Sequence, residues 1–192
     1  MLKALGNAWT VPELRRKLMF TAVILILYRL GCYVPLPGIN QEALGIIEEN
    51  GNAITGLFGV FTGGAFNNLS VFALGIMPYI TASIVMQLLT VAVPRLQELA
   101  KEGETGQQKI TQYTRYFTLA LAFVQSLAMV LFFRSGQVFP GVLTDATPLD
   151  IYLIVITLTA GTMLIMWLGE LISQRGLGNG ISLIISAAIL SQ

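Results

Sequence analysis

No charged residue occurs between Glu49 and Arg95, a stretch of 45 residues. A helix needs roughly 20 residues to cross about 30 Å of hydrocarbon, because each residue rises about 1.5 Å. The stretch is therefore too long to be a single membrane span. We expect it to hold one span and an additional membrane-embedded piece, which lies in the part rich in glycine and phenylalanine from Asn50 to Ser70.

The composition places the chain among polytopic membrane proteins. Of its 192 residues, 55% are hydrophobic and 11% are charged, and the mean hydropathy is +0.74. The sequence has no histidine and a single cysteine, Cys32. Nitrogen and sulfur metal sites, an internal disulfide and histidine-activated nucleophiles are therefore excluded within these residues.

Apolar segments recur along the chain and predict an all-α membrane bundle. The predicted spans are residues 18–34, 71–93, 116–133 and 151–168, and a fifth begins at Ile181. Only 12 residues run from Ile181 to Gln192, which is too few to cross a membrane. We therefore expect the chain to be the front part of a longer protein.

The basic residues predict the orientation. With a cytoplasmic N-terminus, nine of the eleven Lys and Arg residues fall inside, while Arg134 lies outside and Arg29 lies near the outer end of the first span. The nine are Lys3, Arg15, Arg16, Lys17, Arg95, Lys101, Lys109, Arg115 and Arg175.

The same rule predicts a re-entrant segment at residues 54–68. If this segment crossed the membrane fully, every later span would be inverted, so we expect it to enter from the outside and return there. Backbone of this kind must be buried in protein or line a water-filled cavity. Phe58 and Phe61 can share a helical face, and Gly63-Gly64 breaks the helix and weakens fixed packing. A movable stopper that is displaced at low cost and an ordinary interfacial loop helix both remain open.

The span at 71–93 combines apolar and polar positions. Ile76 and Ile80 share one face, and Pro78 falls in the opening turns, where proline is tolerated or kinks the helix. Thr81, Ser83 and Gln87 add polarity, and such side chains usually face other helices or water. Simple helix packing is the commoner use of these residues.

The sequence does not support several catalytic or nucleotide-binding sites that its motifs could suggest. Gly176, Gly178 and Gly180 follow no strand and precede no acidic residue, so they do not predict a dinucleotide loop, and Asn179 is better read as a helix cap. Asp150 and Glu170 lie at opposite ends of one predicted span, about 30 Å apart, and cannot act as a catalytic pair. We therefore expect no enzyme activity and no cofactor.

The residues also bear on two other classes of membrane protein. A secondary transporter would place ionisable groups at a midplane break, and residues 54–93 have none. A helical bundle that carries no transport activity by itself is the other alternative.

Some charged residues favour structural roles. Thr10 to Glu13 fits a capping box for a short amphipathic helix that carries the three adjacent basic residues, within a cytoplasmic arm at residues 1–17. These charges could equally be a topology signal. We expect Arg29 to snorkel or to meet a carboxylate, and Glu170 and Arg175 to be interfacial charges.

Six motifs together resemble the SecY family of channel subunits from the bacterial protein-translocation machinery, over a region from about Trp9 to the last residue. They are residues 35–38 (PLPG), 72–80 (FALGIMPYI), 101–106 (KEGETG), 112–116 (QYTRY), 166–170 (MWLGE) and 175–182 (RGLGNGIS). Members of the family have ten spans in two pseudo-symmetric halves. The resemblance implies that this chain is the N-terminal half, cut within its fifth span.

The resemblance also assigns roles to the positions described above. It implies a plug at residues 55–68 that closes the outer funnel, and an apolar pore ring at mid-membrane. The plug residues are Leu57, Phe58, Phe61, Gly63, Gly64 and Phe66, and the ring residues are Ile76, Ile80, Ile181 and Ile185. Both isoleucine pairs have i,i+4 spacing, and an apolar constriction of stiff side chains holds back ions by dewetting.

The family's mechanism further implies a lateral gate and partners. Thr81 and Gln125 match a polar cluster at the gate through which signal sequences leave, and Ser83 and Gln87 are weaker candidates, although helix packing would use the same residues. The implied partners are SecE, SecG, the SecA motor or the ribosome, signal sequences, unfolded polypeptides, lipid and the C-terminal half of the channel. The implied location is the bacterial cytoplasmic membrane. Gln107 and Gln108 depart from the family pattern, which is commonly basic there, and this puts in doubt how strongly that loop contacts the ribosome or SecA.

Overall fold

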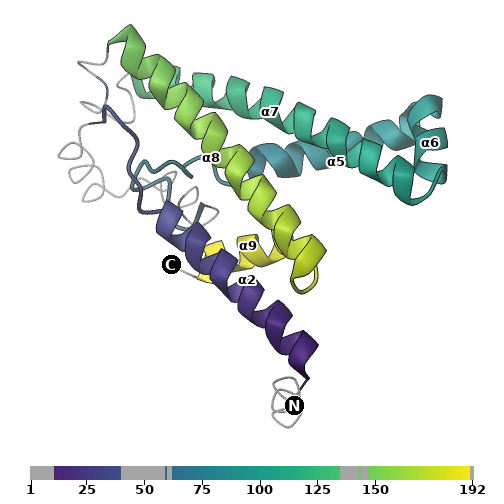
Figure 1. Ribbon diagram of the computed structural model, residues 1–192. Coiled ribbons are helices and arrows are strands. Elements are labelled where there is room, and N and C mark those ends of the chain that lie inside the picture. Colours follow the sequence, from purple (N-terminus) through teal and green to yellow (C-terminus); the bar gives the residue numbers. More distant parts are fainter. Residues whose placement is uncertain (1–10, 40–58, 60–61, 135–142, 144–146, 191–192) are drawn as a thin grey trace.

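A computed structural model describes residues 11–39, 59, 62–134, 143 and 147–190. Within these ranges the chain is helical, and the β pairing found there is an isolated bridge between Pro35 and Ser70 (Figure 1). The helices are α2 (Pro12–Gly31), α5 (Met77–Ala92), α6 (Pro94–Lys101), α7 (Glu104–Arg134), α8 (Pro148–Arg175) and α9 (Gly180–Leu190).

Helix α2 begins earlier than the predicted first span. Pro12 occupies the first turn and Val11 is the N-cap, without a side-chain hydrogen bond, so the predicted capping box at Thr10 and Glu13 is wrong. The helix then runs unbroken to Gly31, so the basic residues at 15–17 belong to the same helix as the apolar segment and not to a separate short one. It ends where a side chain at Gly31 would collide with the Phe72 ring, with a Cβ only 2.1 Å from Phe72 Cε2.

The predicted span at 71–93 is helical only over its later part. Residues 63–76 form turns and a bridge, and α5 starts at Met77 with Pro78 in its first turn. At the other end Pro94 restricts the residue before it, and Val93 is accordingly extended at φ −104° and ψ 113°. Helix α6 starts at Pro94 and is bent by 98° from α5.

Helices α7 and α8 extend beyond the spans predicted at 116–133 and 151–168. Helix α7 has 31 residues because the polar segment from Glu104 to Arg115 continues into the apolar one without a break. Helix α8 has 28 residues and starts at a capping box, in which Thr147 and Asp150 each accept a hydrogen bond from the other's backbone N–H.

By length and composition, α7 and α8 can cross a membrane, and the bent pair α5 and α6 is a third candidate. Helix α2 is not among these candidates, because it carries five charged residues within 20. Helix α9 has 11 residues and is shorter than a span. Membrane spans at α2 and α9 therefore stay predictions.

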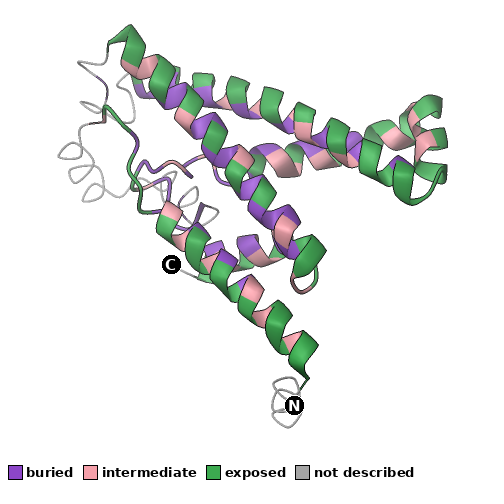
Figure 2. Cartoon of the chain, viewed as in Figure 1, coloured by how far each residue is buried: buried purple, intermediate pink, exposed green. Residues whose placement is uncertain are grey.

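Helix α8 is the centre of the packing. It contacts α7 on one side and α2 and α9 on the other, and 12 of its 28 residues are buried, all between Ile154 and Ile172 (Figures 1 and 2). On α7 a buried row of mostly small residues recurs every four positions, as is typical of helices packed in membranes. The row is Gly106, Ile110, Thr114, Thr118, Ala122, Ser126 and Val130.

Neighbouring helices alternate in direction. Helix α2 runs antiparallel to α8, and α5 runs antiparallel to α7, as Figure 1 shows. The start of α2 and the end of α8 therefore lie together at one tip of the molecule, and α6 and the start of α7 lie at another (Figure 1). Eight of the nine basic residues predicted to be cytoplasmic belong to these parts; the ninth, Lys3, lies outside the described residues.

Candidate functional site

The segment before α5 is fastened to the chain that leaves α2. Leu36 N–H donates to the carbonyl of Leu69 at 3.0 Å, and Val71 N–H donates to the carbonyl of Val34 at 2.9 Å. These hydrogen bonds flank the bridge of Pro35 with Ser70. The turns at residues 63–76 are therefore held by hydrogen bonds against the chain that follows the C-terminal end of α2.

Helix α2 also binds the C-terminal end of the predicted plug. Arg29 Nη1 donates to the Gly63 carbonyl at 2.7 Å, and the Tyr28 hydroxyl donates to the Thr62 carbonyl at 3.4 Å. Gly63 and Gly64 adopt positive φ angles of 63° and 80°, which exposes this carbonyl to the guanidinium. Among the described contacts, Arg29 also lies 5.4 Å from the Tyr33 ring, and the expectation that it snorkels or meets a carboxylate stays a prediction.

Phe66 anchors the same end from the other side. Its side chain is buried and packs in a cluster with Leu69 and Val130, and its ring centroid lies 6.2 Å from that of Phe133 on α7. Its N–H donates to Thr62 Oγ1 at 3.1 Å. Phe66 is therefore firmly packed, whereas an added Cβ on Gly64 would meet nothing within 4 Å, so the weak packing expected at Gly63-Gly64 itself is not contradicted. Leu57, Phe58 and Phe61 lie outside the described residues.

The four isoleucines predicted to form a ring come together in one apolar cluster. Ile76 is buried at the N-cap of α5, and Ile80, Ile181 and Ile185 are half-buried against the same cluster. The cluster also contains Ile184, which is the most buried isoleucine of α9 at 1% exposure. Spacing alone missed Ile184, because it falls between the two chosen positions and its burial depends on contacts with other helices.

A cavity of about 410 Å³ lies beside this cluster. Ile80 and Ile181 belong to its wall, together with Ser83 and Gln87 of the predicted gate. The other lining residues are Tyr79, Met86, Thr90, Ala100, Gln107, Ile110, Thr111, Thr114 and Asn179. Hydroxyl and amide side chains dominate this wall, and none of its residues is charged. The cavity therefore offers a neutral polar surface between α5, α7 and the turn into α9.

The predicted gate residues are not joined to one another by any hydrogen bond among the described contacts. Thr81 Oγ1 donates to the carbonyl of Met77 at 3.0 Å, and Ser83 Oγ donates to the carbonyl of Ile80 at 3.4 Å. Both hydroxyls therefore satisfy themselves within α5. Gln87 is exposed on α5, and Gln125 is half-buried on α7.

A partly buried ion pair lies near this cavity and was not predicted. Arg115 of α7 donates from Nε to Glu170 Oε1 at 2.8 Å and from Nη2 to Glu170 Oε2. The Glu170 side chain is only 10% exposed, so it is held against Arg115, and the expectation that it lies at the membrane interface stays a prediction. Arg115 lies in the motif at residues 112–116 and Glu170 in the motif at residues 166–170. The two residues are 55 positions apart, and nothing in the spacing of the sequence could pair them.

No group of three or more metal-binding side chains occurs in the described part of the chain. Asp150 and Glu170 stand at opposite ends of α8, as expected. The site is therefore an apolar cluster with a neutral cavity beside it and the hydrogen-bonded turns at residues 63–76 next to it. Such surfaces can line a passage or pack against other helices.

Comparison with known proteins agrees with this architecture. A family model described as SecY matches residues 70–192. The protein translocase subunits SecY of Halalkalibacterium halodurans and Streptomyces coelicolor are 49% and 48% identical to the chain, and each alignment covers 98% of it. The alignments cover 43% and 45% of those relatives, so the chain spans less than half of their length.

Solved structures support the fold. Sec61 in the canine ribosome-channel complex from the endoplasmic reticulum superposes with a TM-score of 0.61 at 23% identity, over 91% of this chain and 36% of that one. A structure described as a protein-conducting channel gives a TM-score of 0.59 at 22% identity, over 91% and 36%. Since the family model covers more than half of the sequence, the chain belongs to the SecY family.

Proposed function

We propose that this chain forms one half of the wall of a protein-conducting channel. In the complete subunit the channel would move unfolded polypeptides outward across the bacterial cytoplasmic membrane and release apolar helices into the lipid. The observation that carries the proposal is the apolar cluster of Ile76, Ile80, Ile181 and Ile185, with a neutral polar cavity on one side and the fastened end of the plug on the other.

The physical case for a passage is the character of these surfaces. An apolar constriction resists water and ions without binding them, and yields when a chain pushes through. The absence of charge from the cavity wall suits a substrate of unspecified sequence, because a fixed charge would retain segments of opposite sign. The chain supplies no chemistry in this mechanism, so energy must come from partners.

The orientation and partners follow from the same proposal. We place the N-terminus in the cytoplasm, because the described basic residues predicted to be inside belong to the start of α2, the end of α8, helix α6 and the first turns of α7, and the alternating helix directions allow one side of a membrane for all four. SecE and SecG would complete the membrane complex, and SecA or a ribosome would deliver substrate at the cytoplasmic end. Thr81, Ser83, Gln87 and Gln125 would lie at the lateral gate, where polar contacts of about 1 kcal/mol each can be replaced by a signal helix.

The plug would consist of an end anchored at residues 62–66 and a part upstream of Thr62. Thr62 to Phe66 is held by α2 and α7, so displacement of the plug would begin upstream of Thr62 or would require rupture of the Arg29–Gly63 hydrogen bond.

Crosslinking in the complete subunit tests the proposal. Cys32 is replaced by serine, one cysteine is placed at Ile80, and a stalled secretory chain with its own cysteine is presented. Signal-dependent crosslinking at Ile80 is the expected result. The matched control is Val124→Cys, because the Val124 side chain is 61% exposed on the face of α7 that points away from the other helices. Crosslinking at Val124 without crosslinking at Ile80 would remove the pore assignment and leave helix packing as the role of the isoleucines.

A further inference from the structure

We propose that a hollow between α2 and the end of α8 binds the phosphate of an anionic phospholipid from the cytoplasmic leaflet. The hollow has a volume of about 500 Å³, and its lining residues are Glu13, Arg16, Lys17, Phe20 and Arg175. This lipid site is independent of polypeptide conduction, and it rests only on the proposed membrane orientation of α2 and α8.

The charge of the hollow is unbalanced. Three of its five lining residues are basic and one is acidic. Within the described part of the chain, none of these four residues forms an ion pair. The lining therefore carries a net charge of +2 that the protein does not neutralise, and a phosphate is an anion that arginine and lysine both bind well.

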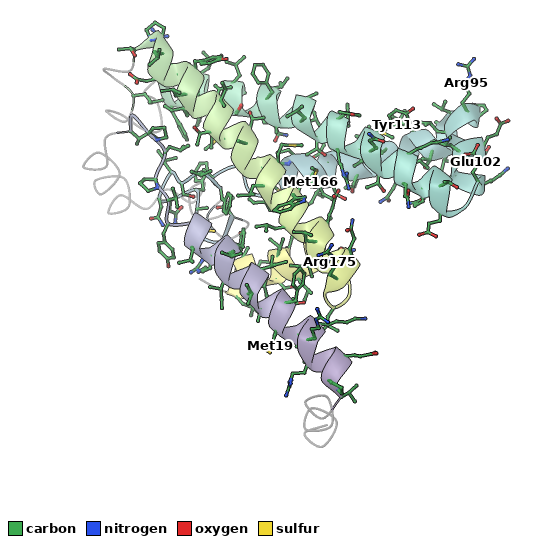
Figure 3. The ribbon with its side chains drawn as sticks, viewed as in Figure 1. Met19, Arg95, Glu102, Tyr113, Met166 and Arg175 are labelled. Carbon is green, nitrogen blue, oxygen red and sulfur yellow. The ribbon has the colours of Figure 1, made fainter. Side chains whose placement is uncertain are left out.

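The fold brings these like charges together from distant parts of the sequence. Thr21 of α2 donates from Oγ1 to the Lys17 carbonyl at 2.9 Å, and it accepts a hydrogen bond from Leu177 N–H at 3.3 Å. This contact fixes the chain just after Arg175 against the turn of α2 that follows Lys17. Figure 3 shows Arg175 on the end of α8 that faces the N-terminal half of α2.

Close packing at this junction depends on a glycine. A Cβ on Gly176 would lie 2.6 Å from Thr21 Oγ1 and 2.7 Å from the Ile172 carbonyl oxygen. The helices can therefore approach closely enough for Arg175 to share one hollow with Arg16 and Lys17. A fold that holds repelling charges in place in this way is better stabilised with an anion between them.

The surroundings favour a lipid over a free phosphate ion. Phe20 gives the hollow an apolar side, and the outward face of α2 continues away from it as a series of apolar residues, each more than half exposed. These residues are Met19, Val23, Ile26, Leu27 and Leu30. A phospholipid can place its phosphate among the basic side chains and its acyl chains along this face, whereas a free ion uses only the first contact.

Lipid retention by the complete subunit, purified with its partner subunits, tests this site. Native mass spectrometry compares phosphatidylglycerol with phosphatidylcholine of the same acyl chains. We expect phosphatidylglycerol to be retained preferentially. Each of Arg16→Gln, Lys17→Gln and Arg175→Gln should weaken its retention about fivefold, which is the effect of removing one basic residue near an anionic headgroup.

Arg15→Gln is the matched control. Arg15 is an exposed basic residue on the same helix, next to Arg16, but it does not line the hollow. It should change retention less than twofold. An equal loss with Arg15→Gln and Arg16→Gln would overturn the site in favour of diffuse surface attraction, as would equal retention of the two lipids by the unmodified protein.

Two further measurements distinguish a bound phospholipid from a bound soluble phosphate. Glycerol phosphate in solution should not displace the lipid, and Phe20→Ala should weaken lipid retention. Full displacement by glycerol phosphate would mean that the hollow binds a soluble phosphate and would overturn the lipid assignment. If a partner subunit covers the hollow in the complex, none of the three glutamine variants should alter lipid retention, and that result would also overturn it. Unfolding temperatures of all variants exclude a folding defect as the cause.

Discussion

Arg115 of α7 and Glu170 of α8 form a bidentate ion pair in which the two side chains differ in exposure. The carboxylate side chain is 10% exposed, whereas the guanidinium side chain is 42% exposed. Breaking such a pair leaves one charge behind, and the penalty depends on whether that charge can reach water. The two halves of the pair are therefore not equivalent.

Arg115→Gln should destabilise the complete protein more than Glu170→Gln. The first change strands a buried carboxylate, for which we expect a loss of about 3 kcal/mol in unfolding free energy. The second leaves an arginine that can turn toward water, for which we expect about 1 kcal/mol. Denaturant unfolding in detergent measures both. The double variant should be less destabilised than Arg115→Gln alone, and equal single effects that add in the double variant would contradict the coupling.

Arg29→Gln should loosen the anchored end of the plug. The hydrogen bond from Arg29 Nη1 to the Gly63 carbonyl has a charged donor, and bonds of this kind contribute about 1.5–3 kcal/mol. Its loss should raise the population of displaced plug by about tenfold or more, measured as ion leakage from liposomes that contain the complete channel at rest.

The control for this variant is Arg134→Gln. Arg134 is an exposed basic residue in the last turn of α7, and the proposed orientation places it on the same side of the membrane as Arg29. It should not change leakage. Equal leakage from both variants would indicate a general effect of outer charge and not release of the plug.

The sequence predicted the helices where local signals agree with tertiary packing. The apolar segments at 116–133 and 151–168 lie within α7 and α8, and the span predicted at 71–93 ends next to the last residue of α5, Ala92, where Pro94 forces an extended residue before it. The start of α5 could not be predicted from the apolar run at 71–93. Residues 70–76 are held by hydrogen bonds to the end of α2 and by Gly75 at φ 57° against Thr62, and these contacts override helix propensity.

Part of the site was predictable from periodicity and part from the family resemblance. Spacing of four residues placed Ile76 and Ile80 on one face, whereas the resemblance selected Ile181 and Ile185 and implied that the four lie together. The structure joins both pairs in one cluster, although their role as a pore ring stays a prediction. The hydrogen bond from Arg29 to Gly63 could not be found in the same way, because the acceptor is a backbone carbonyl, which every residue carries.

Gly161→Ala should destabilise the protein strongly, whereas Gly169→Ala should not. A Cβ on Gly161 would lie 2.1 Å from the Val71 carbonyl oxygen, so backbone must move, and we expect a loss of about 3 kcal/mol. A Cβ on Gly169 would lie 3.1 Å from Ile181 Cγ1, which is part of a side chain that can shift. The gain in helix propensity, up to about 1 kcal/mol, should offset that contact. Unfolding temperatures test the pair, and a larger loss for Gly169→Ala would contradict the packing described for α8.

Ile80→Asn should raise the ion permeability of the complete channel several-fold in its resting state. Ile80 is half-buried in the isoleucine cluster and lines the cavity beside it, so an amide at this position would bind water where an apolar side chain excludes it. Ile80→Leu keeps the position apolar and should leave the resting permeability low. Ile84→Asn is the matched control, because Ile84 lies one turn further along α5 and is 52% exposed. Single-channel recording in planar bilayers measures all three. Equal permeability of the Ile80→Asn and Ile84→Asn channels would mean that the asparagine acts by disturbing α5, since only the residue in the cluster borders the proposed passage.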